Sequence, residues 1–127
     1  MKPRRRSLSF ALAALGMMVL AGAAHATACF TWDCDETTRV CTFNTSCSSI
    51  PSGASLTGYR LIYGDGNSTG TSTTTSYSHG YSQNFANVTL EVYSFGYTLE
   101  QTVQCDINIR NVVGPPLPTS GTCTTEP

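Results

Sequence analysis

Asp65 and His79 have the residue types that a catalytic pair needs. Asp65 lies in the segment Gly64-Asp65-Gly66, and His79 follows in Ser78-His79-Gly80-Tyr81. Acyl transfer would also require an activated nucleophile and an oxyanion site. Gly66-Asn67-Ser68-Thr69-Gly70 has the spacing G-x-S-x-G, but no helical pattern follows it, as a nucleophile elbow requires. There is also no cysteine–histidine pattern. We therefore expect no enzyme activity: Asp65 caps a turn, and His79 packs or hydrogen-bonds at the end of a strand.

A second pair of potential acids and bases is the adjacent Asp35 and Glu36. Neighbouring residues on an extended chain point in opposite directions, so two adjacent carboxylates do not share one reacting group. We expect both at the solvated tip of a hairpin.

Six cysteines carry the remaining chemistry. An even number of cysteines in a short exported chain predicts three disulfides, and six cysteines allow 15 pairings. Zinc sites use closely spaced C-x2-C pairs or histidine partners; there is no C-x2-C here, and His79 is the one histidine beyond residue 26. The cysteines are Cys29, Cys34, Cys41, Cys47, Cys105 and Cys123.

One pairing can be argued from the residues. Cys34 and Cys41 flank the polar segment 35–40, between two segments that alternate apolar and polar residues. A hairpin would bring the two thiols within bridging distance, and the closed loop would contribute about 2–3 kcal/mol. The other pairings stay open, although Cys123 should return to Cys29, Cys47 or Cys105 because a free thiol invites intermolecular bridging.

The N-terminal segment predicts export. Four of the first six residues are basic, the apolar run Phe10–Ala23 follows, and Ala24-His25-Ala26 ends it. The run is shorter than the roughly 20 residues of a membrane span, so we interpret residues 1–26 as a cleaved signal peptide and expect a secreted or periplasmic protein. A lipoprotein anchored at Cys29 is an alternative, but it would leave five cysteines.

Composition limits the remaining part of the chain. Cleavage after Ala26 leaves 101 of the 127 residues, which is enough for one domain. Three arginines stand against eight acidic residues there, a net charge of −5. This charge excludes a basic nucleic-acid surface, and no second membrane span remains. The oligomeric state stays open.

Short runs rich in β-branched and aromatic residues, separated by Gly, Ser and Asn, predict an all-β domain over residues 27–110. Residues 111–127 form a Pro- and Thr-rich tail, which we expect to be tied back through Cys123 because proline lacks the donor that a sheet needs. The spacing of the strands favours a β-sandwich. The expected strands are Ala28–Cys34, Val40–Asn44, Leu56–Tyr63, Ser72–Ser78, Asn87–Tyr93 and Tyr97–Ile109.

Three motifs carry a family resemblance. Tyr59–Gly66 runs into the Gly-Asp-Gly turn, Ser78–Tyr81 follows, and Val88–Val92 alternates strictly. Their order resembles the PKD (polycystic kidney disease) domain, whose repeats look like Y-x-W-D-F-G-D-G, S-H-T-Y and V-T-L-T-V. The resemblance extends over residues 28–109. It implies an immunoglobulin-like, PKD-type β-sandwich of about seven strands, here stapled by disulfides, with Gly64, Asp65, Gly66 and His79 in structural turn positions.

The chain also departs from the family. Leu61 and Ile62 replace Trp-Asp, and Gly80 replaces the threonine of S-H-T-Y. Some PKD domains bind calcium through carboxylates in the loop that matches residues 48–53, which holds none here. Because calcium takes six or more oxygens, several of them charged, we expect no metal and no cofactor.

These features predict a non-catalytic binding or adhesion module that recognises an extracellular protein or polysaccharide. Function on such folds lies in loops and surface side chains. The alternative is a small secreted inhibitor of a protease or another enzyme, which would present the loop Asp35–Val40. Candidate ligand contacts are the aromatic residues Tyr77, Tyr81, Tyr93, Phe95 and Tyr97.

Overall fold

The computed structural model describes residues 26–51, 53–112 and 114–125. The signal peptide expected over residues 1–26 lies outside this part, except for Ala26. The described residues form strands and no helix, so none of their elements could span a membrane as a helix. The strands are β2 (Cys29–Asp35), β3 (Val40–Asn44), β4 (Leu56–Ile62), β5 (Ser76–Gly80), β6 (Phe85–Ser94), β7 (Thr98–Asn108) and β8 (Ser120–Thr124).

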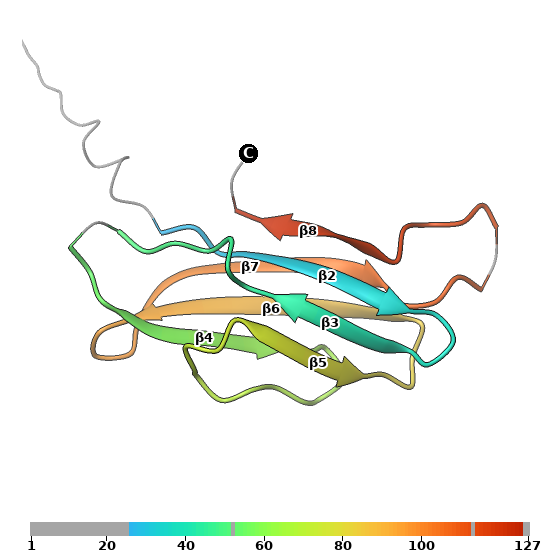
Figure 1. Ribbon diagram of the computed structural model, residues 1–127, viewed down its shortest axis with the longest axis horizontal. Coiled ribbons are helices and arrows are strands. Elements are labelled where there is room, and N and C mark those ends of the chain that lie inside the picture. Colours follow the sequence, from blue (N-terminus) through green and yellow to red (C-terminus); the bar gives the residue numbers. More distant parts are fainter. Residues whose placement is uncertain (1–25, 52, 113, 126–127) are drawn as a thin grey trace, which may run out of the picture.

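The strands make two antiparallel sheets that lie face to face and run along the long axis of the molecule (Figure 1). One sheet has the order β5-β3-β2-β8, and the other has the order β4-β6-β7. The β2–β3 hairpin places Cys34 opposite Cys41, and β6 pairs with β7 along nearly its whole length. The expected all-β sandwich is therefore present.

Alternating residues of both sheets fill the space between them. On β6 every second side chain, from Ala86 to Val92, is buried, because side chains on a strand alternate between its two faces. Phe30 and Phe43 of the opposite sheet meet edge to face with ring centroids 6.0 Å apart. Each fully buried large aliphatic side chain contributes about 1.5–3 kcal/mol. The largest are Leu61, Leu90, Ile107, Ile109, Val88 and Val92.

The Ser/Thr-rich segment after β4 corrects one expected strand. Ser72 exchanges two backbone hydrogen bonds with Tyr59, of 2.7 and 3.0 Å, and an isolated bridge joins Ser68 to Ile62. Residues 68–72 thus lie beside β4 and cover its open edge. For this reason β5 begins only at Ser76, and the strand expected over Ser72–Ser78 is wrong in its first half.

The C-terminal segment is more than a stapled tail. Residues 120–124 form β8, which pairs with β2 over its whole length, from Cys29↔Thr124 to Asp33↔Ser120. Gly121 lies against Trp32: a Cβ at this position would come within 3.2 Å of the indole ring. The proline-containing stretch stays outside the sheet, as expected, but the sheet extends beyond the predicted domain end at residue 110.

Three disulfides join all six cysteines. Cys34 bonds to Cys41 across the β2–β3 hairpin, as the sequence predicts. Cys29 bonds to Cys47, which ties the start of β2 to the loop after β3. Cys105 bonds to Cys123 and joins β7 to β8, the adjacent edges of the two sheets.

Candidate functional site

The Gly64-Asp65-Gly66 turn follows β4 and is shaped by its glycines. Gly64 has a φ of 88° and Gly66 has a φ of 95°, in the region where a side chain causes strain. Gly64 also lies against β6, since a Cβ there would come within 2.3 Å of the backbone oxygen of Asn87. Asp65 Oδ1 accepts a 3.1 Å hydrogen bond from the backbone N–H of Asn67, which closes the turn.

The structure brings Asp65 and His79 together. Asp65 Oδ2 lies 2.7 Å from His79 Nε2, and the two side chains are only 15% and 17% exposed. The imidazole stacks on the Tyr63 ring, with centroids 3.9 Å apart and planes within 2° of parallel. Burial raises the pKa of Asp65, but the hydrogen bonds from His79 and Asn67 outweigh it and hold the pKa below its usual value.

Tyr81 completes this cluster from below the surface. Its side chain is buried, its ring meets His79 edge-on at 4.7 Å, and its hydroxyl donates a 2.8 Å hydrogen bond to the backbone oxygen of Tyr63. Burial raises the pKa of the Tyr81 hydroxyl well above its usual value. Tyr81 therefore belongs to the core, and its assignment as a ligand contact is wrong.

The cluster holds a carboxylate and an imidazole but no partner for them to activate. A nucleophilic site needs a hydroxyl or thiol within hydrogen-bond reach of the base. Among the described residues, no serine, threonine or cysteine side chain is hydrogen-bonded to His79. The Asp65–His79 contact therefore has a structural role. It joins the turn after β4 to β5, across the two sheets.

The adjacent carboxylates Asp35 and Glu36 separate as their spacing predicts. Asp35 Oδ1 accepts hydrogen bonds from the backbone N–H groups of Thr37 and Thr38, at 2.8 and 3.2 Å. Glu36 Oε1 instead accepts a 2.9 Å bond from the backbone N–H of Asn111. One carboxylate caps the hairpin turn, and the other holds the segment that leads to β8.

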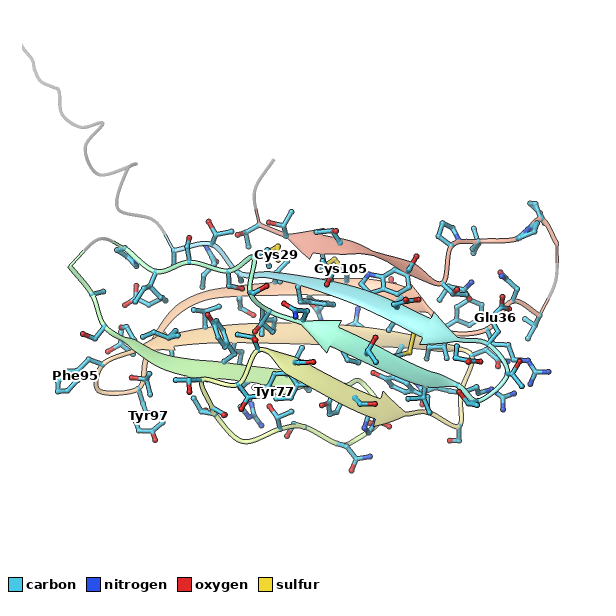
Figure 2. All side chains as sticks on the ribbon, in the orientation of Figure 1. Cys29, Glu36, Tyr77, Phe95, Tyr97 and Cys105 are labelled. Atoms are coloured by element: carbon cyan, nitrogen blue, oxygen red, sulfur yellow. A yellow bond between two sulfur atoms is a disulfide. The ribbon has the colours of Figure 1, made fainter. Side chains whose placement is uncertain are left out.

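Two of the five aromatic candidates form an exposed pair at the β6–β7 turn. Phe95 is 81% exposed and Tyr97 is 69% exposed; with Gly96 between them, we call these residues the aromatic tip. Figure 2 shows both rings projecting at one end of the molecule, far from Glu36 at the other end. The backbone N–H of Phe95 donates a 2.9 Å bond to the oxygen of Ser55, which fixes the tip to the loop before β4.

Tyr77 and Tyr93 are only partly accessible. Tyr77 lies on β5 in the middle of the molecule and packs against the core (Figure 2). The Tyr93 hydroxyl donates a 2.9 Å bond to Glu91 Oε1, and this bond raises the pKa of Tyr93. The structure thus separates the candidates by exposure, which the sequence pattern alone did not do.

A hollow that sequence reasoning missed lies where the chain leaves β7. Asn108 sits at the end of this strand and is only 7% exposed; Asn111, Val112, Gly114, Pro115 and Leu117 line the same hollow. An asparagine next to a proline-rich segment gives no signal of burial. No group of three or more potential metal ligands occurs in the described part of the chain.

The chain matches no family model, no curated protein and no solved structure. Its function must therefore be argued from its own residues.

Proposed function

We propose that the chain is a non-catalytic, secreted or periplasmic binding module with a PKD-like, immunoglobulin-type sandwich, and that it contacts an extracellular protein or polysaccharide through the aromatic tip. Three disulfides favour an oxidising compartment outside the cytosol. The predicted signal peptide supports the same location.

The order of the strands supports the family part of the proposal. Immunoglobulin-type constant domains have the sheets A-B-E-D and C-F-G. With β2, β3 and β5 as A, B and E, and β4, β6 and β7 as C, F and G, the two orders agree. The described part of the chain departs in two ways: residues 68–72 lie beside β4 where strand D would be expected on the other sheet, and β8 is added next to β2.

The Asp65–His79 contact supports the same family. Both residues stand in the motifs on which the PKD resemblance rests, and the structure joins the two motifs by a 2.7 Å contact. This role needs no substrate and no reaction, which agrees with a module that binds without catalysing.

The aromatic tip is the observation that carries the binding function. Aromatic side chains supply a large contact area and stack on sugar rings or pack into protein pockets. The Tyr97 ring is exposed, and its backbone has a φ of 57°. This left-handed conformation costs a non-glycine residue about 1–2 kcal/mol. Strain of this kind gathers at sites that contact ligands. The two exposed rings and the strained turn do not stabilise the fold, and we infer that they serve ligand binding.

A retention assay tests the proposal. The purified protein is mixed with insoluble cell wall, chitin or collagen, and the bound fraction is compared with that of the double variant Phe95→Ala/Tyr97→Ala. We expect retention on one of these materials and at least a tenfold loss in the variant. Val40→Ala, which shortens an exposed apolar side chain on the hairpin β2–β3, serves as the matched control. Equal retention of wild type and tip variant, or retention of neither, would contradict the proposal.

The disulfide-closed hairpin tip supports enzyme inhibition as a second candidate function. Cys34 and Cys41 close the loop with their Cα atoms 4.0 Å apart, and Asp35 caps the turn from within. Rigid loops bind at a lower entropic cost. Alanine substitutions across Asp35–Val40 that abolish inhibition of a protease, while the aromatic tip is intact, would favour this function over adhesion.

A further inference from the structure

A strip of outward-facing side chains continues from the aromatic tip along β6 and β7, which follow the long axis of the molecule (Figure 1). On β6 every second residue from Phe85 to Tyr93 faces outward, because the residues between them are buried in the core. Exposed residues of β7 lie beside them on the same face. We call six of these residues the outer strip: Phe85, Asn87, Glu91, Tyr93, Gln104 and Asp106.

Aromatic rings stand at both ends of the outer strip. Tyr93 lies just before the aromatic tip and pairs with Leu99, which is 49% exposed. Phe85 begins β6 at the other end of the strip and is 51% exposed. At the usual rise of about 3.4 Å per residue, the strand between these two rings spans about 27 Å. Rings this far apart suit an extended ligand, which can stack on both, better than a compact one.

Near the aromatic tip, an ion pair fixes the polar part of the strip. Glu91 Oε1 accepts a 2.9 Å hydrogen bond from the Tyr93 hydroxyl and a 3.0 Å bond from Arg60 Nη1 of the neighbouring strand β4. Arg60 Nη2 also donates a 3.3 Å bond to Ser68 Oγ. Both bonds to Glu91 end on one oxygen, so the second oxygen can accept a hydrogen bond from a ligand. The positive charge of Arg60 is neutralised within the pair.

Further along the strip, two exposed amides and an exposed carboxylate form a chain of hydrogen bonds. Asn87 Nδ2 donates a 2.8 Å bond to Asp106 Oδ1, and Gln104 Nε2 donates to Asn87 Oδ1. Each amide nitrogen keeps one N–H for a ligand, while the second oxygen of Asp106 and the amide oxygen of Gln104 can still accept. Hydroxyl groups match this mixture, because each of them can donate one hydrogen bond and accept others. The strip thus offers preoriented polar groups to a ligand that is rich in hydroxyls.

We propose that the outer strip and the aromatic tip together bind one extended, uncharged polysaccharide chain with β-1,4 linkages, of the cellulose or chitin type. This inference rests on the proposed function and names its ligand class. Each sugar ring has an apolar face, which stacks on an aromatic ring, and hydroxyl groups at its edge, which bond to the polar side chains. A β-1,4-linked chain is straight and ribbon-like, so it can follow a strand from one end to the other.

Charge and desolvation favour this ligand over its competitors. The carboxylates of Glu91 and Asp106 repel an anionic polysaccharide, and Arg60 offers little compensation because Glu91 already pairs with it. A protein partner would have to bury this ion pair away from water, which is costly, and charged residues are depleted at the centres of protein interfaces. Sugar hydroxyls instead replace the hydrogen bonds that water makes with these groups.

Isothermal titration calorimetry with two series of oligosaccharides tests the proposal on the purified protein. Cellohexaose or chitohexaose binds, and the hexasaccharide binds at least tenfold more tightly than cellobiose or chitobiose, because only the longer chain reaches beyond the aromatic tip. The series that binds identifies the sugar. In affinity electrophoresis, the uncharged polymer of that series, hydroxyethylcellulose or glycol chitin, retards the protein at a concentration at least tenfold lower than its carboxymethyl derivative, whose charges meet the two carboxylates of the strip.

Variants on the strip and on the opposite sheet locate the site. Asn87→Ala/Gln104→Ala removes two exposed polar side chains from the strip. The control Thr42→Ala/Ser78→Ala removes two exposed polar side chains from the paired strands β3 and β5 of the other sheet. The strip variant weakens hexasaccharide binding at least tenfold, whereas the control leaves it unchanged; equal melting temperatures show that both are folded. Phe85→Ala, at the far end of the strip, weakens hexasaccharide binding at least fivefold.

Three results would each overturn the proposal: equal affinity for the hexasaccharide and the disaccharide, equal binding by wild type and the strip variants, or binding of neither series. These results leave the proposed function standing wherever Phe95→Ala/Tyr97→Ala still abolishes retention on cell wall or collagen. Failure of the proposed function has a different signature, which is equal retention of wild type and the tip variant.

Discussion

Gly64→Ala should be among the most damaging single-methyl additions in this protein. Two effects add at this position. The φ of 88° costs an L-residue about 1–2 kcal/mol. The new Cβ would also lie 2.3 Å from the backbone oxygen of Asn87 and 3.0 Å from its backbone nitrogen and carbon. These atoms belong to β6, in the centre of its sheet, so they move only if the sheet moves.

The size of the effect follows from comparing three glycines. Overpacking against a fixed neighbour costs about 1–3 kcal/mol, so with the backbone term Gly64→Ala should lower the free energy of unfolding by about 2–5 kcal/mol. Gly66 has a φ of 95° but nothing within 4 Å of its Cβ position, and Gly66→Ala should cost about 1–2 kcal/mol. Gly70 has open space and no positive φ, so Gly70→Ala should be neutral or stabilising by less than about 1 kcal/mol.

Urea unfolding provides the measurement. Trp32 is the only tryptophan of the chain and packs against the core, so its fluorescence reports global unfolding. Thermal unfolding gives a second measurement, in which each kcal/mol of destabilisation lowers the melting temperature of a domain of this size by about 4–8 °C. If Gly64→Ala costs no more than Gly66→Ala, the close approach to β6 does not exist, and the turn contributes through its backbone conformation alone.

Two further predictions concern the cross-link at the sheet edges and the Asp65–His79 contact. Cys105→Ala/Cys123→Ala should lower the free energy of unfolding by about 3 kcal/mol, because the pair closes a loop with a sequence separation of 18; an unchanged urea midpoint would refute this. Asp65→Ala should destabilise by about 1–2 kcal/mol at pH 7, because it removes an acceptor that both His79 and Asn67 use. The pKa of Asp65 is lowered on folding, so its contribution is fully present above the unfolded value near 4 and is lost as the pH falls through the folded value. The difference between Asp65→Ala and wild type should therefore narrow in acid, and a difference that stays constant down to pH 2 would contradict this assignment.

The parts of the fold that follow from local pattern were predictable. The bounds Val40–Asn44 are those of β3, and the strict alternation over Val88–Val92 lies within β6 with its apolar side chains buried. The pair Cys34–Cys41 also followed, because a hairpin fixes its own register.

The parts that depend on distant neighbours were not predictable. Ser120–Thr124 has no apolar alternation, and it forms a strand only because β2 offers an open edge and Gly121 fits beneath Trp32. Tyr81 and Tyr97 each follow a glycine and precede a hydroxyl residue in the chain. One is buried against His79 and the other is exposed at a turn, because the packing of the two sheets determines which face each ring meets.

The connectivity of the disulfides bears on how the chain reaches its native pairing during oxidation. The bridge Cys34–Cys41 is nested inside Cys29–Cys47, whereas Cys105–Cys123 lies in a separate part of the chain. If thiols joined in the order in which they occur along the chain, Cys29 would pair with Cys34, and Cys41 would pair with Cys47. Neither of these pairs is native.

The first hairpin must therefore align Cys34 with Cys41 before Cys29 reacts, or thiolate exchange must later correct the error. Cys105 and Cys123 differ, because joining thiols in chain order gives their native bond directly. We therefore expect disulfide isomerisation to involve the first four cysteines, and the bridge between the sheet edges to close without it.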